Sequence, residues 1–73
     1  MIEVRLFATF REGREKILFF ESDHYFCVDN ILAELRIPAG EVAILLVNGI
    51  HSKPDTPVKD GDIVALFPPI GGG

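Results

Sequence analysis

The fold is constrained most by a single helical stripe that lies between segments with the character of β-strands. The stripe is formed by four apolar residues at the i, i+3, i+4 and i+7 spacing of one helix face: Val28, Ile31, Leu32 and Leu35. Pro38 disfavours helical geometry at the residue before it, so the helix is expected to end at about Arg36. A helix this short is not stable alone, and we therefore predict that it packs on a sheet.

The first third of the chain predicts a β-hairpin. Residues 2–9 begin by alternating apolar and polar side chains, which is the period of a strand with one face in the core. Residues 15–21 are rich in aromatic and β-branched side chains, which favour strands. A turn around Gly13 is expected to join the two strands.

The second half of the chain predicts three more strands. Residues 42–47 form an apolar run, and the following Asn48-Gly49 is a strong signal for a hairpin turn into a short strand. After a proline-containing loop, residues 63–67 read as a last strand, which ends at two prolines because proline cannot donate to a β-ladder.

This order of elements predicts an α+β protein with a β-grasp (ubiquitin-like) fold. Such a fold has a mixed sheet of about five strands packed on one main helix, with the last strand parallel to the first and next to it. We expect residues 1–70 to form the β-grasp domain and residues 71–73 to form a flexible glycine tail.

Composition restricts the classes of partner. The 73 residues suffice for one domain, and the formal net charge of −4 argues against nucleic acid, which selects basic surfaces. No apolar run is long enough to span a membrane, and the first residues lack a signal-peptide pattern, so a cytoplasmic location is expected. The single Cys27 excludes an internal disulfide and a cysteine-built zinc site.

Most other polar and reactive residues are predicted to have structural roles. Cys27 is expected to be a small buried hydrophobe rather than a reactive thiol. We expect His24 and His51 to lie at the surface without metal-ligand spacing. The acidic residues in turns are expected to be solvated charges: Glu12, Glu15, Asp60 and Asp62.

The last three residues, Gly71, Gly72 and Gly73, add little to folding, because glycine has no side chain to bury and loses much backbone entropy. They suit a thin thread that enters a narrow channel and presents the Gly73 carboxylate. From Pro68 to Gly73 such a thread spans at most about 20 Å. A disordered end or a cloning remnant is the alternative interpretation.

Two aromatic residues are candidates for a partner interface. Phe7 and Phe67 fall out of step with the core faces of two strands that should be neighbours, and exposed aromatics are typical of interfaces. With Pro68, Pro69 and Ile70 they form the predicted interface. The alternative is that both phenylalanines are core residues.

Two segments resemble the MoaD/ThiS sulfur-carrier family. These are Leu-Val-Asn-Gly at residues 46–49 and Asp-Gly-Asp-Ile-Val-Ala-Leu-Phe-Pro-Pro-Ile at residues 60–70, followed by the glycine end. The Phe-Pro-Pro-Ile run is most similar to MoaD, the small subunit of molybdopterin synthase, and residues 4–8 fit the family too. Family members usually have a small residue such as Ala or Thr where this chain has Gly71.

The resemblance implies a carrier that is not itself an enzyme. An E1-like adenylating enzyme of the MoaB/MoeB/ThiF type would use ATP to adenylate Gly73, and sulfur transfer would convert it to a thiocarboxylate. The thiocarboxylate would donate sulfur inside an acceptor like the large subunit of molybdopterin synthase, in molybdenum or tungsten cofactor biosynthesis. The chain has no glycine-rich phosphate loop, and it is expected to bind no cofactor or metal by itself.

Three alternatives remain open at this point. The chain could be a thiamine-type or other sulfur carrier, or a ubiquitin-like modifier that is joined through Gly73 to lysines of other proteins. It could also be a passive interaction domain. A β-grasp fold alone does not choose between them.

Overall fold

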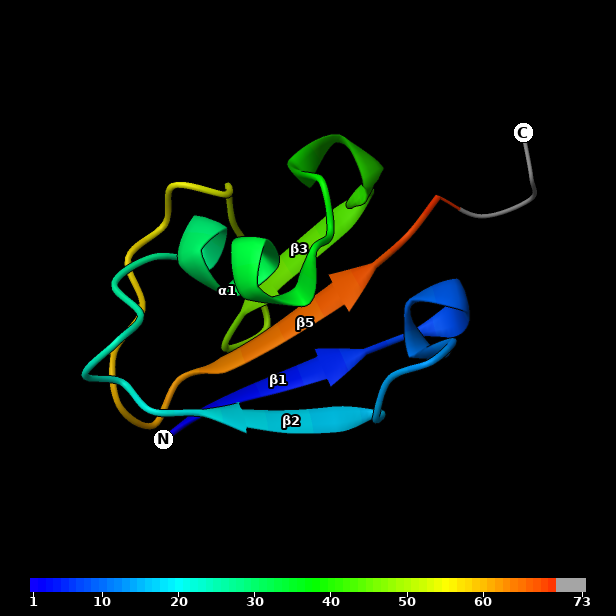
Figure 1. Ribbon diagram of the computed structural model, residues 1–73. Helices are drawn as coiled ribbons and strands as arrows, with labels where there is room; N and C mark the ends of the chain where they lie inside the picture. Colours follow the sequence, from blue (N-terminus) through cyan, green and yellow to red (C-terminus); the bar gives the residue numbers. More distant parts are fainter. Residues whose placement is uncertain (70–73) are drawn as a thin grey trace.

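One mixed sheet carries the α-helix on one of its faces (Figure 1). The computed structural model describes residues 1–69. The strands are β1 (Ile2–Leu6), β2 (Ile17–Phe20), β3 (Ile44–Val47), β4 (Ile50–His51) and β5 (Ile63–Phe67). The helix is α1 (Val28–Leu35), and two 3-10 turns are η1 (Ala8–Arg11) and η2 (Ala39–Glu41). The predicted domain limit at residue 70 and the tail at 71–73 lie outside the described residues.

The strand order in the sheet is β2-β1-β5-β3-β4, which places β5 at the centre. Strand β5 runs parallel to β1, with Val4 opposite Val64, and antiparallel to β3, with Leu45 opposite Leu66. In Figure 1 the arrows of β1 and β5 lie side by side and point the same way. This arrangement is the β-grasp fold that the order of elements predicts.

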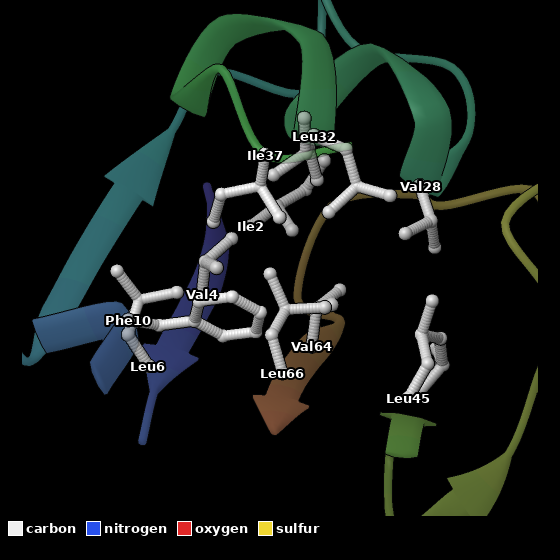
Figure 2. Packing of buried hydrophobic residues seen from close by; sticks show 12 residues of the cluster. Ile2, Val4, Leu6, Phe10, Val28, Leu32, Ile37, Leu45, Val64 and Leu66 are labelled. Atoms are coloured by element: carbon white, nitrogen blue, oxygen red, sulfur yellow. The ribbon is translucent and has the colours of Figure 1, made fainter. Parts of the chain in front are cut away.

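The core lies between the sheet and α1, as Figure 2 shows. Alternate residues of β1 and β5 point into it, because successive side chains of a strand face opposite sides of the sheet. The apolar stripe of α1 covers them, as its helical spacing predicts. The buried cluster comprises Ile2, Val4, Leu6, Phe10, Val28, Ile31, Leu32, Ile37, Leu45, Val47, Val64 and Leu66.

Helix α1 begins and ends with specific backbone arrangements. The Asn30 side-chain oxygen accepts hydrogen bonds from the backbone N–H groups of Phe26 (2.9 Å) and Cys27 (3.1 Å), and so fixes the chain just before the first turn. At the other end Arg36 adopts left-handed geometry with φ 59°, and the N–H of Ile37 donates to the carbonyl of Leu32. The helix therefore ends where the sequence predicts.

The predicted hairpin turn at Asn48-Gly49 is confirmed. Both residues have positive φ, 53° and 80°, as the common two-residue hairpin turn requires. Glycine adopts this geometry freely, and asparagine tolerates it better than most residues. The turn sets the register that places Val47 opposite Ile50.

The first strand is shorter than predicted. It ends at Leu6, and Ala8 has φ 53° at the start of η1 instead of extended geometry. The reason is Phe10, which η1 turns into the core at 5% exposure. Likewise β3 begins at Ile44 instead of residue 42, because Val42 caps η2 (Ala39–Glu41) before the strand starts.

Two predictions about single residues are wrong. Cys27 is half-buried where α1 begins, and its backbone forms a bridge to Pro57, so it is not a fully buried hydrophobe. Asp62 is not a solvated turn charge, because it is 4% exposed.

Within the described part of the chain, no helix is long and apolar enough to cross a membrane.

Candidate functional site

The site is built where the central strand ends. The carbonyl of Leu66 accepts a hydrogen bond from the N–H of Phe7 (3.2 Å), and the carbonyl of Phe67 accepts one from Ala43 (2.8 Å). Hydrogen bonds thus hold β5 up to Leu66 on the β1 side and up to its last residue, Phe67, on the β3 side. Pro68 and Pro69 have no N–H and cannot extend the ladder, so the chain leaves the sheet from its middle.

Phe7 and Phe67 lie together at this end of the sheet. Their rings are stacked with centroids 4.2 Å apart and planes 9° from parallel. Both are half-buried, and both lie on the face opposite α1, because their neighbours Leu6 and Leu66 point into the core. The prediction that they are out of step with the core is confirmed, and their role in partner binding stays a prediction.

The stack continues across the outer face of the sheet. Ile44 lies opposite Phe67 and Leu46 lies opposite Ala65, so β3 and β5 present apolar side chains on this face. The outward side chains of β1 are the charged Glu3 and Arg5, and Phe7 follows that strand. Ile44 is 37% exposed, and Leu46 and Ala65 are half-buried. We call Phe7, Ile44, Leu46, Ala65 and Phe67 the docking surface.

Basic side chains border the docking surface beside Phe7. The Arg11 guanidinium lies 5.2 Å from the centre of the Phe7 ring, and Arg11 Nε donates to the carbonyl of Leu6 at 2.8 Å. A shallow pocket of about 150 Å³ lies next to it. It is lined by Arg5, Leu6, Phe7, Arg11, Lys16 and Ile17.

Sequence reasoning missed this basic border. The pattern placed Arg11 in a polar turn after a strand that ran to residue 9. The turn η1 instead brings Arg11 back over Phe7. No local signal in the sequence marks this contact, because it depends on the burial of Phe10.

The structure describes only two of the remaining predicted site residues, Pro68 and Pro69. Pro68 is buried and Pro69 is exposed, so Pro69 is the proline that can meet a partner. Ile70, Gly71, Gly72 and Gly73 lie outside the described residues. The structure therefore describes where this segment starts, namely beside the docking surface.

A larger hollow, of about 660 Å³, lies beside α1. It is lined by His24, Tyr25, Asn30, Ala33, Glu34 and Arg36. The Tyr25 hydroxyl donates to Glu34 at 3.3 Å, and burial together with this carboxylate raises the pKa of Tyr25. None of these residues belongs to the docking surface, so the hollow is separate from the end of β5.

The sequence of the chain is similar to those of known proteins. The family model described as the ThiS family matches residues 4–73. Small archaeal modifier protein 3 of Haloferax volcanii is 30% identical over 99% of this chain and 98% of that protein.

Solved structures with the same fold include a Haloferax volcanii protein determined in solution. It is 34% identical, with a TM-score of 0.74, over 99% of this chain and 85% of that one. Another match lies in the complex of subunits 1 and 2 of the molybdopterin-converting factor from Helicobacter pylori. It is 28% identical, with a TM-score of 0.65, over 99% of this chain and 97% of that one.

Proposed function

Because this chain belongs to the ThiS family of sulfur-carrier and ubiquitin-like proteins, we propose that it carries sulfur on the carboxylate of Gly73. The observation that carries the proposal is the end of β5, where the central strand delivers the chain from the sheet beside an aromatic docking surface. The carrier supplies the group that reacts, and partner enzymes supply the catalysis.

The proposed chemistry has two steps. The ionised carboxylate of Gly73 attacks the α-phosphorus of ATP on an E1-like adenylating enzyme, and pyrophosphate leaves. A nucleophile whose sulfur has the oxidation state of sulfide then attacks the carbonyl carbon of the acyl-adenylate, and AMP leaves. The product is a terminal thiocarboxylate, whose sulfur the acceptor protein consumes.

The residues of this chain contribute positioning and recognition. The two hydrogen bonds at Leu66 and Phe67 anchor the base of the segment, so a partner that binds the docking surface also locates the start of the segment. Fixing three glycines in a channel costs on the order of 3–6 kcal/mol of backbone entropy. Apolar contact on Phe7, Phe67 and their neighbours offsets this cost.

The pathway proposed is that of molybdopterin, with molybdenum or tungsten as its metal. The Phe-Pro-Pro-Ile run favours this choice, and so does the likeness to one subunit of the Helicobacter pylori molybdopterin-converting factor complex. The acceptor would then be a protein like the large subunit of molybdopterin synthase, and the work would take place in the cytoplasm.

The second candidate is a protein modifier joined through Gly73 to lysines of other proteins. The relative named small archaeal modifier protein 3 favours it. Both functions begin with adenylation of Gly73, and they differ in whether sulfur or a lysine amine displaces AMP. The presence of Gly73 in isopeptide bonds would separate the second from the first.

The experiment that tests the shared step measures ATP–pyrophosphate exchange by the adenylating enzyme of the same organism. The chain is compared with a variant lacking Gly73 and with one carrying an extra alanine after it. We expect both changes to reduce exchange to background while the circular dichroism spectrum stays unchanged. Exchange at the unmodified rate with either variant would contradict the proposal, and absence of exchange with the unaltered chain would favour a passive interaction domain.

A further inference from the structure

The outer edge of β2 is an unpaired and apolar strand that the proposed carrier function does not use. Strand β2 ends the sheet, and its only described neighbour is β1. Its two side chains on the face opposite α1 are Ile17, which is 47% exposed, and Phe19, which is 61% exposed. An exposed apolar edge strand is a template for pairing with another strand.

The register shows which main-chain groups of β2 point outward. The N–H of Leu6 donates to the carbonyl of Lys16 at 2.8 Å, which marks a hydrogen-bonded pair. Such pairs recur at every second position of an antiparallel ladder, so Leu18 and Phe20 also bond to β1. The N–H and C=O groups of Ile17 and Phe19 consequently point away from the sheet.

The outward groups and the exposed side chains thus belong to the same two residues. Acidic residues lie beyond both ends of β2, where Glu15 and Glu21 keep the two-residue spacing of Ile17 and Phe19 in the sequence. Both glutamates are exposed, Glu21 at 64%. The row therefore reads acidic, apolar, apolar, acidic.

Nearby cations offset this acidity only in part. Arg5, which lies opposite Ile17, is already paired with Glu3 on the same strand. His24 lies 3.8 Å from Glu21 and is charged only when protonated. Lys16 lines the shallow pocket beside Ile17 with Arg5 and Arg11, so its charge offsets part of that of the neighbouring Glu15.

A second copy of the chain fits this edge poorly. Antiparallel self-pairing centred on Leu18 uses the outward groups well, since it places Ile17 opposite Phe19 of the other copy. It also places Glu15 opposite Glu21 at both ends of the pairing. Like charges directly opposite each other destabilise a strand pair.

We propose that the β2 edge binds an extended segment of a partner protein with two alternate apolar residues flanked by Lys or Arg. Main-chain hydrogen bonds to Ile17 and Phe19 would add the segment as a sixth strand. The basic flanks would pair with Glu15 and Glu21, in keeping with the chain's net charge of −4. This recognition needs neither the tail nor its sulfur.

The probe is the blocked peptide acetyl-Lys-Thr-Val-Thr-Val-Thr-Lys-amide, titrated into the full chain and followed by amide NMR. We expect the largest shifts, and slowed hydrogen exchange, at the amides of Ile17 and Phe19. A peptide with Glu in place of both Lys should bind about tenfold more weakly. N-methylation of both valines should weaken binding at least about tenfold, whereas N-methylation of the first and third threonines should not.

A matched pair of variants tests the charge argument. Glu15→Lys with Glu21→Lys should reverse the preference, so that the Glu-flanked peptide binds more tightly than the Lys-flanked one. Glu41→Lys with Asp55→Lys makes the same charge change at exposed sites away from β2 and should leave the preference unaltered.

Three results would overturn the proposal. The first is absence of shifts at Ile17 and Phe19, and the second is binding that tolerates methylated valines. The third is concentration-dependent self-association at these two amides, which would assign the edge to a second copy of the chain. None of these results depends on whether Gly73 is adenylated, so the carrier function is tested separately.

Discussion

Asp62 and Asn48 join two turns that lie far apart in the sequence. The Asn48 amide donates to Asp62 at 2.9 Å, and its oxygen accepts from the N–H of Ile63 at 2.9 Å. Asp62 also accepts hydrogen bonds from the N–H and the ammonium group of Lys59. Burial by itself raises the pKa of Asp62, but these hydrogen bonds outweigh it and hold the pKa below its usual range.

This network predicts a pH dependence of stability. A carboxyl whose pKa is lower in the folded state stabilises the fold above its unfolded pKa of about 3.8 and loses that effect as pH falls through the folded value. Asp62→Asn should therefore destabilise the protein by about 1–3 kcal/mol at pH 7 and flatten the loss of stability below about pH 4. Urea unfolding at several pH values measures both.

The exposed Asp60 is the control for this prediction. It is 74% exposed in the same turn, so Asp60→Asn should change neither the stability nor its pH profile by as much. Equal effects of the two substitutions would show that the buried network is unimportant.

The same two aspartates show why the sequence misleads at this scale. Asp60 and Asp62 both read as turn charges around Gly61, and nothing local distinguishes them. What distinguishes Asp62 is its hydrogen bond from the Asn48 amide of another turn, 14 positions earlier in the chain. A contact of this kind appears only once the sheet has brought the two turns together.

At the scale of elements, the end of α1 contains a residue in unfavourable geometry. Arg36 is exposed and has φ 59°, a conformation that costs a residue with a side chain roughly 1–2 kcal/mol and costs glycine little. Arg36→Gly should stabilise the protein by about 0.5–1 kcal/mol, because relief of this penalty exceeds the extra backbone entropy that glycine gains in the unfolded state. Thermal and urea unfolding check the sign.

Arg36→Ala separates backbone geometry from the loss of the side chain. Alanine keeps the penalty for left-handed geometry, so this variant should not gain stability. A gain of the same size with alanine would contradict the explanation.

The stack of Phe7 and Phe67 joins the end of β1 to β5, and within the docking surface Phe67 lies between Phe7 and Ile44. Phe67→Arg should weaken binding of the adenylating enzyme at least about tenfold, because central aromatic residues dominate interface energies. It should lower stability by only about 1 kcal/mol, since the ring is half-buried on the outer face. Calorimetric titration and thermal unfolding measure the two effects on the same preparation.

Phe26 supplies a matched substitution away from this surface. It is 72% exposed and precedes α1, so Phe26→Arg should leave the affinity unchanged. A large fall in melting temperature for Phe67→Arg, with unaltered affinity, would instead make Phe67 a structural residue.

The elements themselves were largely predictable because each has a local cause. The helical stripe specifies α1, Asn48-Gly49 specifies the β3–β4 turn, and the two prolines end β5. The early end of β1 was not predictable from alternation, because it depends on packing Phe10 into the core. The basic border of the docking surface was missed for the same reason, since η1 positions Arg11.

At the scale of the whole molecule, the topology determines where the segment that is proposed to react starts. Strand β5 lies between β1 and β3, so the segment leaves from the best-supported strand and beside an apolar face. The same β-grasp frame serves carriers and modifiers, and the fold alone does not separate the two uses. Under the proposed function, the two uses are separated by what happens to the Gly73 carbonyl after adenylation.

The most direct test is top-down mass spectrometry of the full chain after incubation with its adenylating enzyme, ATP and a sulfur source. We predict that one oxygen at Gly73 is replaced by sulfur, with fragmentation assigning the added mass to the C-terminal fragment and not to Met1 or Cys27. Omission of ATP should abolish the change. An unmodified Gly73, or Gly73 found only in isopeptide bonds to lysines, would contradict the sulfur-carrier account.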